Sequence, residues 1–177
     1  MMTINHVIYI IGFMGSGKST AGKKLASLLG WTFIDLDKNI EEYTGKTIPE
    51  IFSQNGEDYF REIEALLLRK IQSHTDTIIS TGGGTPCHSG NMDFMLSTGL
   101  TIYLKLTPGQ LKSRLSKSKG ERPLIKDLEP QNLQPFIEKK LAEREEWYNR
   151  SEITIEGIDI DININLLLSR VRSRLII

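Results

Sequence analysis

The residues most suited to chemistry form one glycine-rich run near the start of the chain, Gly12-Phe13-Met14-Gly15-Ser16-Gly17-Lys18-Ser19-Thr20. This run fits the phosphate-binding pattern Gly-x4-Gly-Lys-Ser/Thr. Glycines at this spacing allow a tight turn whose backbone N–H groups point at one phosphate chain. In this pattern the lysine reaches the β- and γ-phosphates, and the hydroxyl that follows it holds a magnesium ion. The predicted triphosphate-binding residues are therefore Gly15, Ser16, Gly17, Lys18, Ser19 and Thr20, with Lys18 also catalytic.

The flanking residues supply the elements that such a loop needs. Val7–Ile11 is apolar and β-branched, which predicts a buried strand. After the loop, apolar residues recur at helical spacing, and Gly30 offers a stop for that helix. The alternative is a glycine-rich turn with a surface lysine, and the strand–loop–helix context disfavours it.

The rest of the chain alternates between the two periodicities. Further strands are predicted at 31–37, 77–81, 100–106 and 153–155, and helices at 39–43, 48–55, 57–73, 91–96, 108–115, 133–149 and 161–175. Alternating strands and helices predict a parallel α/β sheet with right-handed crossovers, whose ligands lie beyond the carboxyl ends of the strands. Residues 116–131 are polar and lack a period, which favours a mobile loop or lid.

Composition narrows the class of protein. The chain has 177 residues, with 39% hydrophobic and 25% charged residues, as is usual for one globular domain. Lys+Arg and Asp+Glu each number 22, so no net charge favours nucleic acid or an anionic membrane as a partner. A single cysteine excludes an internal disulfide, and no stretch is long enough for a membrane span. These features predict a cytoplasmic protein.

Two carboxylates come next in importance. Asp35 and Asp37 are two residues apart at the end of a predicted strand, so both side chains should point to the same side, near the phosphates. Magnesium takes one or two protein carboxylates, and a second carboxylate can accept the proton of an attacking hydroxyl. A solvated pair is the alternative, and the upstream phosphate loop disfavours it.

Several other residues have two interpretations. Gly82-Gly83-Gly84 indicates either close approach of a ligand to bare backbone or a tight turn. Arg61 has glutamates beside it and is typical of a surface ion pair as well as of a ligand-binding residue. Arg122 lies in the predicted lid, where an arginine can close on a transferring phosphoryl group. Arg144, considered by itself, is typical of a solvated charged helix.

Taken in order, these pieces resemble the shikimate kinases, in the nucleoside-monophosphate-kinase-like branch of phosphate-loop proteins. The resemblance runs from about residue 6 to 156. It rests on the loop 12–20, Asp35-x-Asp37, Phe60-Arg61-x-x-Glu64, residues 80–84 with Pro86 and Asn91, Arg122-Pro123-Leu124, and Arg144 with Tyr148.

This resemblance implies ATP-dependent phosphorylation of the 3-hydroxyl of shikimate, on the route to chorismate and the aromatic amino acids. It implies a three-layer fold whose five-stranded parallel sheet has the order 2-3-1-4-5. Residues 1–177 would form one kinase domain, with a lid at about 116–131 and a substrate-binding helical segment at about 38–73. The family also suggests a monomer.

The resemblance further implies roles for single residues. Ser19 and Asp35 would hold magnesium, and Arg122 would reach over the ATP phosphates. The residues implied for the shikimate side are Asp37 as hydroxyl ligand and base, Arg61 and Arg144 as carboxylate clamp, and Gly82, Gly83 and Gly84, Gly83 especially, as backbone contacts.

Two rival functions follow from the same loop. A kinase for gluconate or a nucleotide shares the design, but separated arginines and a glycine triplet better suit a small polyhydroxy carboxylic acid. A GTPase-type switch needs Asp-x-x-Gly and Asn-Lys-x-Asp, and neither occurs in the sequence.

Overall fold

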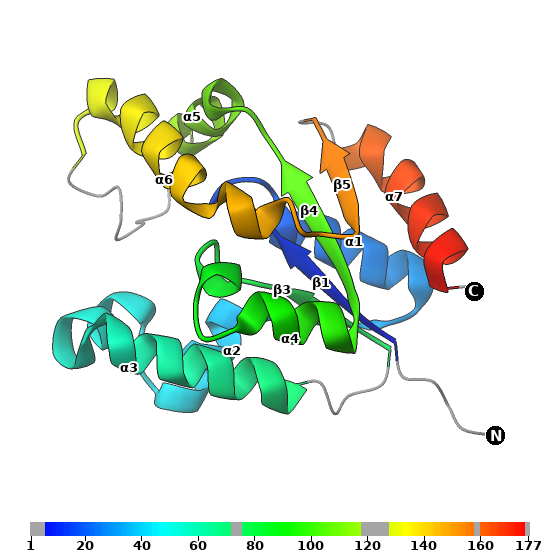
Figure 1. Ribbon diagram of the computed structural model, residues 1–177, viewed down its shortest axis with the longest axis horizontal. Coiled ribbons are helices and arrows are strands. Elements are labelled where there is room, and N and C mark those ends of the chain that lie inside the picture. Colours follow the sequence, from blue (N-terminus) through cyan, green and yellow to red (C-terminus); the bar gives the residue numbers. More distant parts are fainter. Residues whose placement is uncertain (1–5, 72–75, 118–127, 158–159, 176–177) are drawn as a thin grey trace.

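Five parallel strands form one sheet with helices on both faces (Figure 1). The structure, a computed structural model, describes residues 6–71, 76–117, 128–157 and 160–175. The strand order is β2-β3-β1-β4-β5, which confirms the order that the resemblance implied. The strands are β1 Val7–Ile11, β2 Thr32–Asp35, β3 Thr77–Ser80, β4 Leu100–Lys105 and β5 Ile153–Glu156. All five residues of β1 are buried, because this central strand has helices on both sides.

The helices lie close to their predicted ranges. They are α1 Lys18–Leu29, α2 Leu36–Thr44, α3 Ile48–Ile71, α4 Asn91–Thr98, α5 Pro108–Lys117, α6 Leu133–Tyr148 and α7 Ile160–Leu175, with short 3-10 turns at Thr85–Cys87 and Pro130–Asn132. Gly30 and Gly45 end α1 and α2 in the left-handed conformation. Gly56 interrupts α3 with φ 83° and ψ 172°, at the predicted boundary between two helices.

The sheet separates two of the three apolar clusters that form the core of the described ranges. On one face α1 and α7 pack over residues such as Ile8 and Ile10. On the other face α2, α3, α4 and α6 pack over Tyr9 and Ile11. Opposite-facing residues of one strand thus serve both cores, and the carboxyl ends of the strands are held at one edge.

One predicted boundary is wrong. The strand predicted over 31–37 ends at Asp35, and Asp37 lies in the first turn of α2. The Asp35 side chain accepts a hydrogen bond from the Lys38 N–H and caps the helix, which ends the strand early. The two carboxylates therefore do not alternate along a strand.

The predicted lid and the predicted absence of a membrane span can be compared with the described residues only. Of the predicted lid at 116–131, Ser116 and Lys117 belong to α5, and residues 118–127, with Arg122, lie outside the described residues. Within the described part of the chain, no helix has the length and apolar character needed to cross a membrane.

Candidate active site

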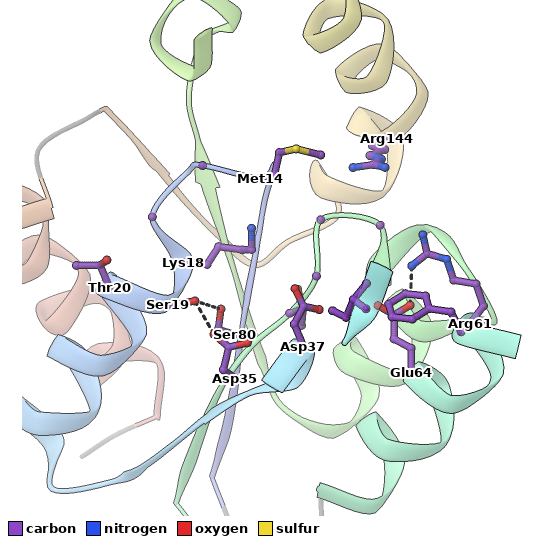
Figure 2. A pocket seen from close by; sticks show the side chains of 18 of the residues that line it. Met14, Lys18, Ser19, Thr20, Asp35, Asp37, Arg61, Glu64, Ser80 and Arg144 are labelled. Carbon is purple, nitrogen blue, oxygen red and sulfur yellow. Dashed lines mark hydrogen bonds and ion pairs between the residues drawn. The ribbon is translucent and has the colours of Figure 1, made fainter. Parts of the chain in front are cut away.

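A pocket of about 950 Å³ lies at the carboxyl ends of the strands (Figure 2). It brings together most of the residues predicted from the sequence, namely Gly15, Gly17, Lys18, Ser19, Thr20, Asp35, Asp37, Arg61, Gly82, Gly83, Gly84 and Arg144. Ser16 is the exception among those described, since it is buried and does not line this pocket.

The phosphate loop has the backbone that its glycines predict. Gly12, Gly15 and Gly17 have φ values of 143°, 81° and 96°, a region that other residues rarely adopt. A Cβ on Gly12 would also lie 2.8 Å from the Leu104 carbonyl oxygen. The loop connects β1 to the N-terminus of α1. At that end of a helix, N–H groups and the helix dipole favour binding of an anion.

The side chain of Lys18 folds back onto the phosphate loop. Its Nζ donates hydrogen bonds to the carbonyl oxygens of Gly12 and Phe13, at 2.9 and 3.0 Å. The side chain is 9% exposed and points into the pocket (Figure 2). The ammonium group is thus held where a phosphate chain in the loop would pass it.

The side-chain oxygens of Ser19, Asp35 and Ser80 lie close together beside the phosphate loop. The Ser19 hydroxyl donates to Asp35 Oδ2 at 2.7 Å, and Ser19 Oγ lies 3.2 Å from Ser80 Oγ. Hydroxyl and carboxylate oxygens suit magnesium, which keeps several waters and takes further oxygens from phosphates. Among the described residues, no group of three or more His, Cys, Asp and Glu side chains could hold a metal ion. Ser80 is an addition to the predicted pair.

Asp37 lies between the phosphate loop and the glycine triplet (Figure 2). A Cβ on Gly82 would be 3.0 Å from Asp37 Oδ1. The pKa of Asp37 is raised to about 6, because burial and the Asp35 and Glu64 carboxylates raise it by more than the nearby Lys18 ammonium lowers it. The carboxyl group is therefore ionised at neutral pH and is a stronger base than an exposed aspartate.

This raised pKa predicts that Asp37 destabilises the fold. Because the folded-state pKa of about 6 exceeds the ordinary 3.8, its contribution is most favourable below pH 3.8 and is lost as the pH rises through 6. We expect Asp37→Asn to raise the free energy of unfolding at pH 7.5 by ~1–2 kcal/mol, a value reduced from the full shift because the group is half-buried. Urea unfolding at pH 4.5 and 7.5 measures this; a gain that is larger at pH 4.5 would contradict it.

Arg61 is both an ion-pair partner and part of the pocket wall. Its guanidinium binds Glu57 at 3.1 Å and Glu64 at 2.8 Å. The Glu64 carboxylate is fully buried and also accepts a hydrogen bond from the Thr85 hydroxyl. The ion pairs therefore orient a guanidinium that lines the pocket, and the role of Arg61 as a ligand-binding residue stays a prediction. Glu64 was part of the resemblance, but no role was predicted for it.

The glycine triplet, which we call the glycine turn (residues 82–84), presents bare backbone to charged side chains. None of its three residues has a positive φ, so a tight turn does not require glycine here. A Cβ on Gly84 would lie 2.6 Å from Arg61 Nη2, and a Cβ on Gly83 would lie 3.2 Å from Arg144 Nη1. Two arginines therefore lie against the bare backbone of Gly83 and Gly84, while Gly82 faces Asp37, Thr85 and Glu64.

Within the described part of the protein, the carbonyl groups of the glycine turn are hydrogen-bonded, whereas its N–H groups are not. The carbonyl oxygens of Gly82 and Gly84 accept from the N–H groups of Thr85 and Cys87, and the Gly83 carbonyl accepts from the Tyr148 hydroxyl. No acceptor for the three glycine N–H groups occurs among the residues that the structure describes. The turn therefore offers donors, together with two guanidinium groups, to an anionic ligand.

No role was assigned from the sequence to the other pocket residues. Arg114 from α5 lines the pocket and donates to the carbonyl oxygens of Gly15 and Ser16, at 3.3 and 3.1 Å, and so supports the phosphate loop. The apolar part of the wall consists of Met14, Ile48, Phe52 and Phe60. Apolar residues at helical spacing are usual for any helix, so the sequence carried no signal that separated these from the core.

Known proteins are similar to this chain in sequence and in fold. A family model described as shikimate kinase matches residues 14–165. The chain belongs to the shikimate kinase family. The span that this family matches begins within the phosphate loop and includes Asp37, Arg61, the glycine turn and Arg144.

Individual shikimate kinases match over most of their length. The shikimate kinase of Parabacteroides distasonis is 42% identical over 150 residues, which cover 85% of this chain and 87% of the relative. The crystal structure of shikimate kinase from Bacteroides thetaiotaomicron matches with a TM-score of 0.89 and 36% identity, over 97% of this chain and 99% of that one. Shikimate kinase from Acinetobacter baumannii, solved in complex with shikimate, matches with a TM-score of 0.87 and 32% identity, over 97% and 95%.

Proposed function

We propose that this protein transfers the γ-phosphoryl group of ATP to the 3-hydroxyl of shikimate, forming shikimate 3-phosphate and ADP on the route to chorismate and the aromatic amino acids. The observation that carries the proposal is the position of Asp37. It lies between a phosphate loop and a glycine turn flanked by two arginines, within one pocket. A base between a phosphate donor site and a carboxylate site suits phosphorylation of a hydroxy acid.

The loop residues 15–20 hold the phosphates of ATP through their N–H groups. Lys18 gives up its bonds to the loop carbonyls and binds the β- and γ-phosphates, because the phosphate oxygens are stronger acceptors for an ammonium group. Arg122, which lies outside the described residues, remains the predicted lid residue that spreads the charge of the transferred group.

The acceptor binds at the other end of the pocket. Arg61, Arg144 and the N–H groups of the glycine turn hold its carboxylate, because guanidinium forks match two carboxylate oxygens. The apolar wall from Met14 to Phe60 packs against the carbon ring of shikimate. The ring hydroxyls then face Asp37, which binds them and orients the reactive one.

The transfer itself needs one proton acceptor. Asp37 takes the proton of the 3-hydroxyl, the hydroxyl oxygen bonds to the γ-phosphorus, and the bond between that phosphorus and the bridging oxygen of ADP breaks. A magnesium ion held by Ser19 and Asp35 would neutralise charge on the β- and γ-phosphates. Electrostatic stabilisation and alignment by Lys18 and the arginines supply the rest of the acceleration.

Removal of magnesium should stop the reaction, and loss of one magnesium ligand should weaken the binding of magnesium. With EDTA in excess we expect no measurable turnover. We expect Ser19→Ala to raise the magnesium concentration for half-maximal rate by about tenfold, as typical for a lost ligand contact. Titration of magnesium at saturating ATP and shikimate measures this. An unchanged midpoint in Ser19→Ala would refute Ser19 as a ligand.

The proposed reaction is tested by a coupled ADP-release assay with ATP and magnesium, comparing shikimate, gluconate, a nucleoside monophosphate and no acceptor. We expect strong stimulation by shikimate only. Stimulation by gluconate or the nucleotide instead would keep a kinase and overturn the acceptor. Equal slow hydrolysis with every acceptor would overturn the kinase proposal. We also propose that the protein is a monomer and acts in the cytoplasm. The molar mass in solution, measured by light scattering, tests whether it is a monomer.

A further inference from the structure

The last residue of α6 makes a long-range bond to the glycine turn. Tyr148 is fully buried, and its hydroxyl donates to the Gly83 carbonyl oxygen at 2.5 Å across 65 residues of sequence. The Gly82 and Gly84 carbonyls accept from N–H groups of the short turn Thr85–Cys87 that follows directly. Tyr148 is thus the partner that comes from a different element, and it holds the middle residue of the turn.

This bond fixes the direction of a donor on the turn. The Gly83 carbonyl and the Gly84 N–H belong to one planar peptide unit, and in a trans peptide they point in opposite directions. The structure has no cis peptide bond in its described ranges. When the carbonyl is bonded to Tyr148 on α6, the N–H of the same unit is directed away from α6. Without the bond, glycine residues on both sides would let this unit rotate.

The same helix carries Arg144, four residues before Tyr148. Residues at this spacing lie on one face of a helix, and Arg144 Nη1 is the atom that a Cβ on Gly83 would meet at 3.2 Å. Tyr148 therefore sets the distance between the end of α6 and the glycine turn. A shift of this helix end would move the Arg144 guanidinium along with it.

We propose that Tyr148 is a positioning residue for the acceptor, which acts by orienting the Gly83–Gly84 peptide unit and by holding Arg144 beside it. This inference rests on the proposed function, because it assumes that the acceptor carboxylate binds at the glycine turn. Tyr148 does not line the pocket, so its effect must reach the acceptor through these two groups. Burial raises the pKa of the Tyr148 hydroxyl, so that it stays a neutral donor at physiological pH.

The test compares Tyr148→Phe with Tyr103→Phe. The two tyrosine rings pack against each other with centroids 5.0 Å apart, and both side chains are buried. Tyr103 neither bonds the glycine turn nor lines the active-site pocket, so its variant is a control for loss of a hydroxyl from the neighbouring ring. We expect Tyr148→Phe to raise KM for shikimate by about tenfold, the size expected for one lost hydrogen bond with a buried partner left unpaired. KM for ATP and kcat should stay within about twofold, and Tyr103→Phe should leave all three unchanged.

A third variant distinguishes a loss of acceptor positioning from a general loss of folding. Replacement of Tyr148 by 3-fluorotyrosine keeps the hydroxyl and the packing, and it should retain the wild-type KM for shikimate. Equal losses for shikimate and ATP, or an unchanged KM for shikimate in Tyr148→Phe, would overturn the inference while the wild-type enzyme still phosphorylates shikimate. A wild-type enzyme that shikimate does not stimulate would overturn the proposed function itself, and this inference with it.

Discussion

Replacement of Asp37 by asparagine is expected to lower kcat by about 10³-fold, within the range usual for loss of a general base. Asparagine keeps the size of the side chain and its capacity to bind hydroxyls, but it cannot accept the proton of the attacking hydroxyl. The affinity for ATP should change by less than about threefold, because Lys18 and the phosphate loop remain in place. Steady-state ADP release and a binding titration with ATP measure the two effects.

The matched control is Asp93→Asn. Asp93 lies in the first turn of α4, is exposed, and pairs with Arg150 away from the pocket, so its loss should not alter kcat.

In the wild-type enzyme, kcat/KM for shikimate should fall tenfold per pH unit below about pH 6, as Asp37 becomes protonated. Near-normal turnover in Asp37→Asn would refute its role as base, and the pH profile would then have to arise from another group.

The second large effect is expected at Arg144. We expect Arg144→Lys to raise KM for shikimate by about 10- to 100-fold, because an ammonium group cannot make the paired hydrogen bonds of a guanidinium to a carboxylate. Arg144 is a cleaner test than Arg61, whose removal would leave the buried Glu64 carboxylate without its ion-pair partner. Initial rates over a range of shikimate concentrations at saturating ATP give the KM.

Arg150→Lys is the control for this substitution. Arg150 follows α6 by two residues and makes its ion pair with Asp93 in an exposed position. It tests whether any loss of an arginine near the end of α6 weakens the enzyme. An Arg144→Lys variant with the KM of the wild type would contradict the carboxylate clamp, whatever its kcat.

The sequence was sufficient for the features that depend on local pattern. The phosphate loop, the helix stop at Gly30 and the boundary between the helices predicted at 48–55 and 57–73 follow from positions where glycine adopts backbone angles that other residues rarely adopt, and the structure has each of them. The strands were recognisable as apolar β-branched runs, because parallel strands are buried on both faces. Their order came from the family resemblance, since periodicity does not determine which strands are neighbours.

The site residues that reasoning from pattern missed depend on tertiary contact. The placement of Asp37 on a strand was wrong because capping by Asp35 starts α2 earlier than the apolar pattern indicates. The bond between Tyr148 and Gly83 joins residues 65 apart, and that between Thr85 and Glu64 joins residues 21 apart. No local spacing predicts such pairs. The contacts of Gly83 with Arg144 and of Gly84 with Arg61 likewise join the turn to helices that are distant in the sequence.

The order of the elements along the chain divides the pocket between two parts of the sequence. β1 pairs with β3 and β4, so the central strands lie within the first 105 residues, together with the phosphate loop and Asp37. Arg144 and Tyr148 belong to α6, which follows later in the sequence. A truncation before α6 would therefore remove two residues of the proposed acceptor side and leave the residues of the phosphate loop in the chain.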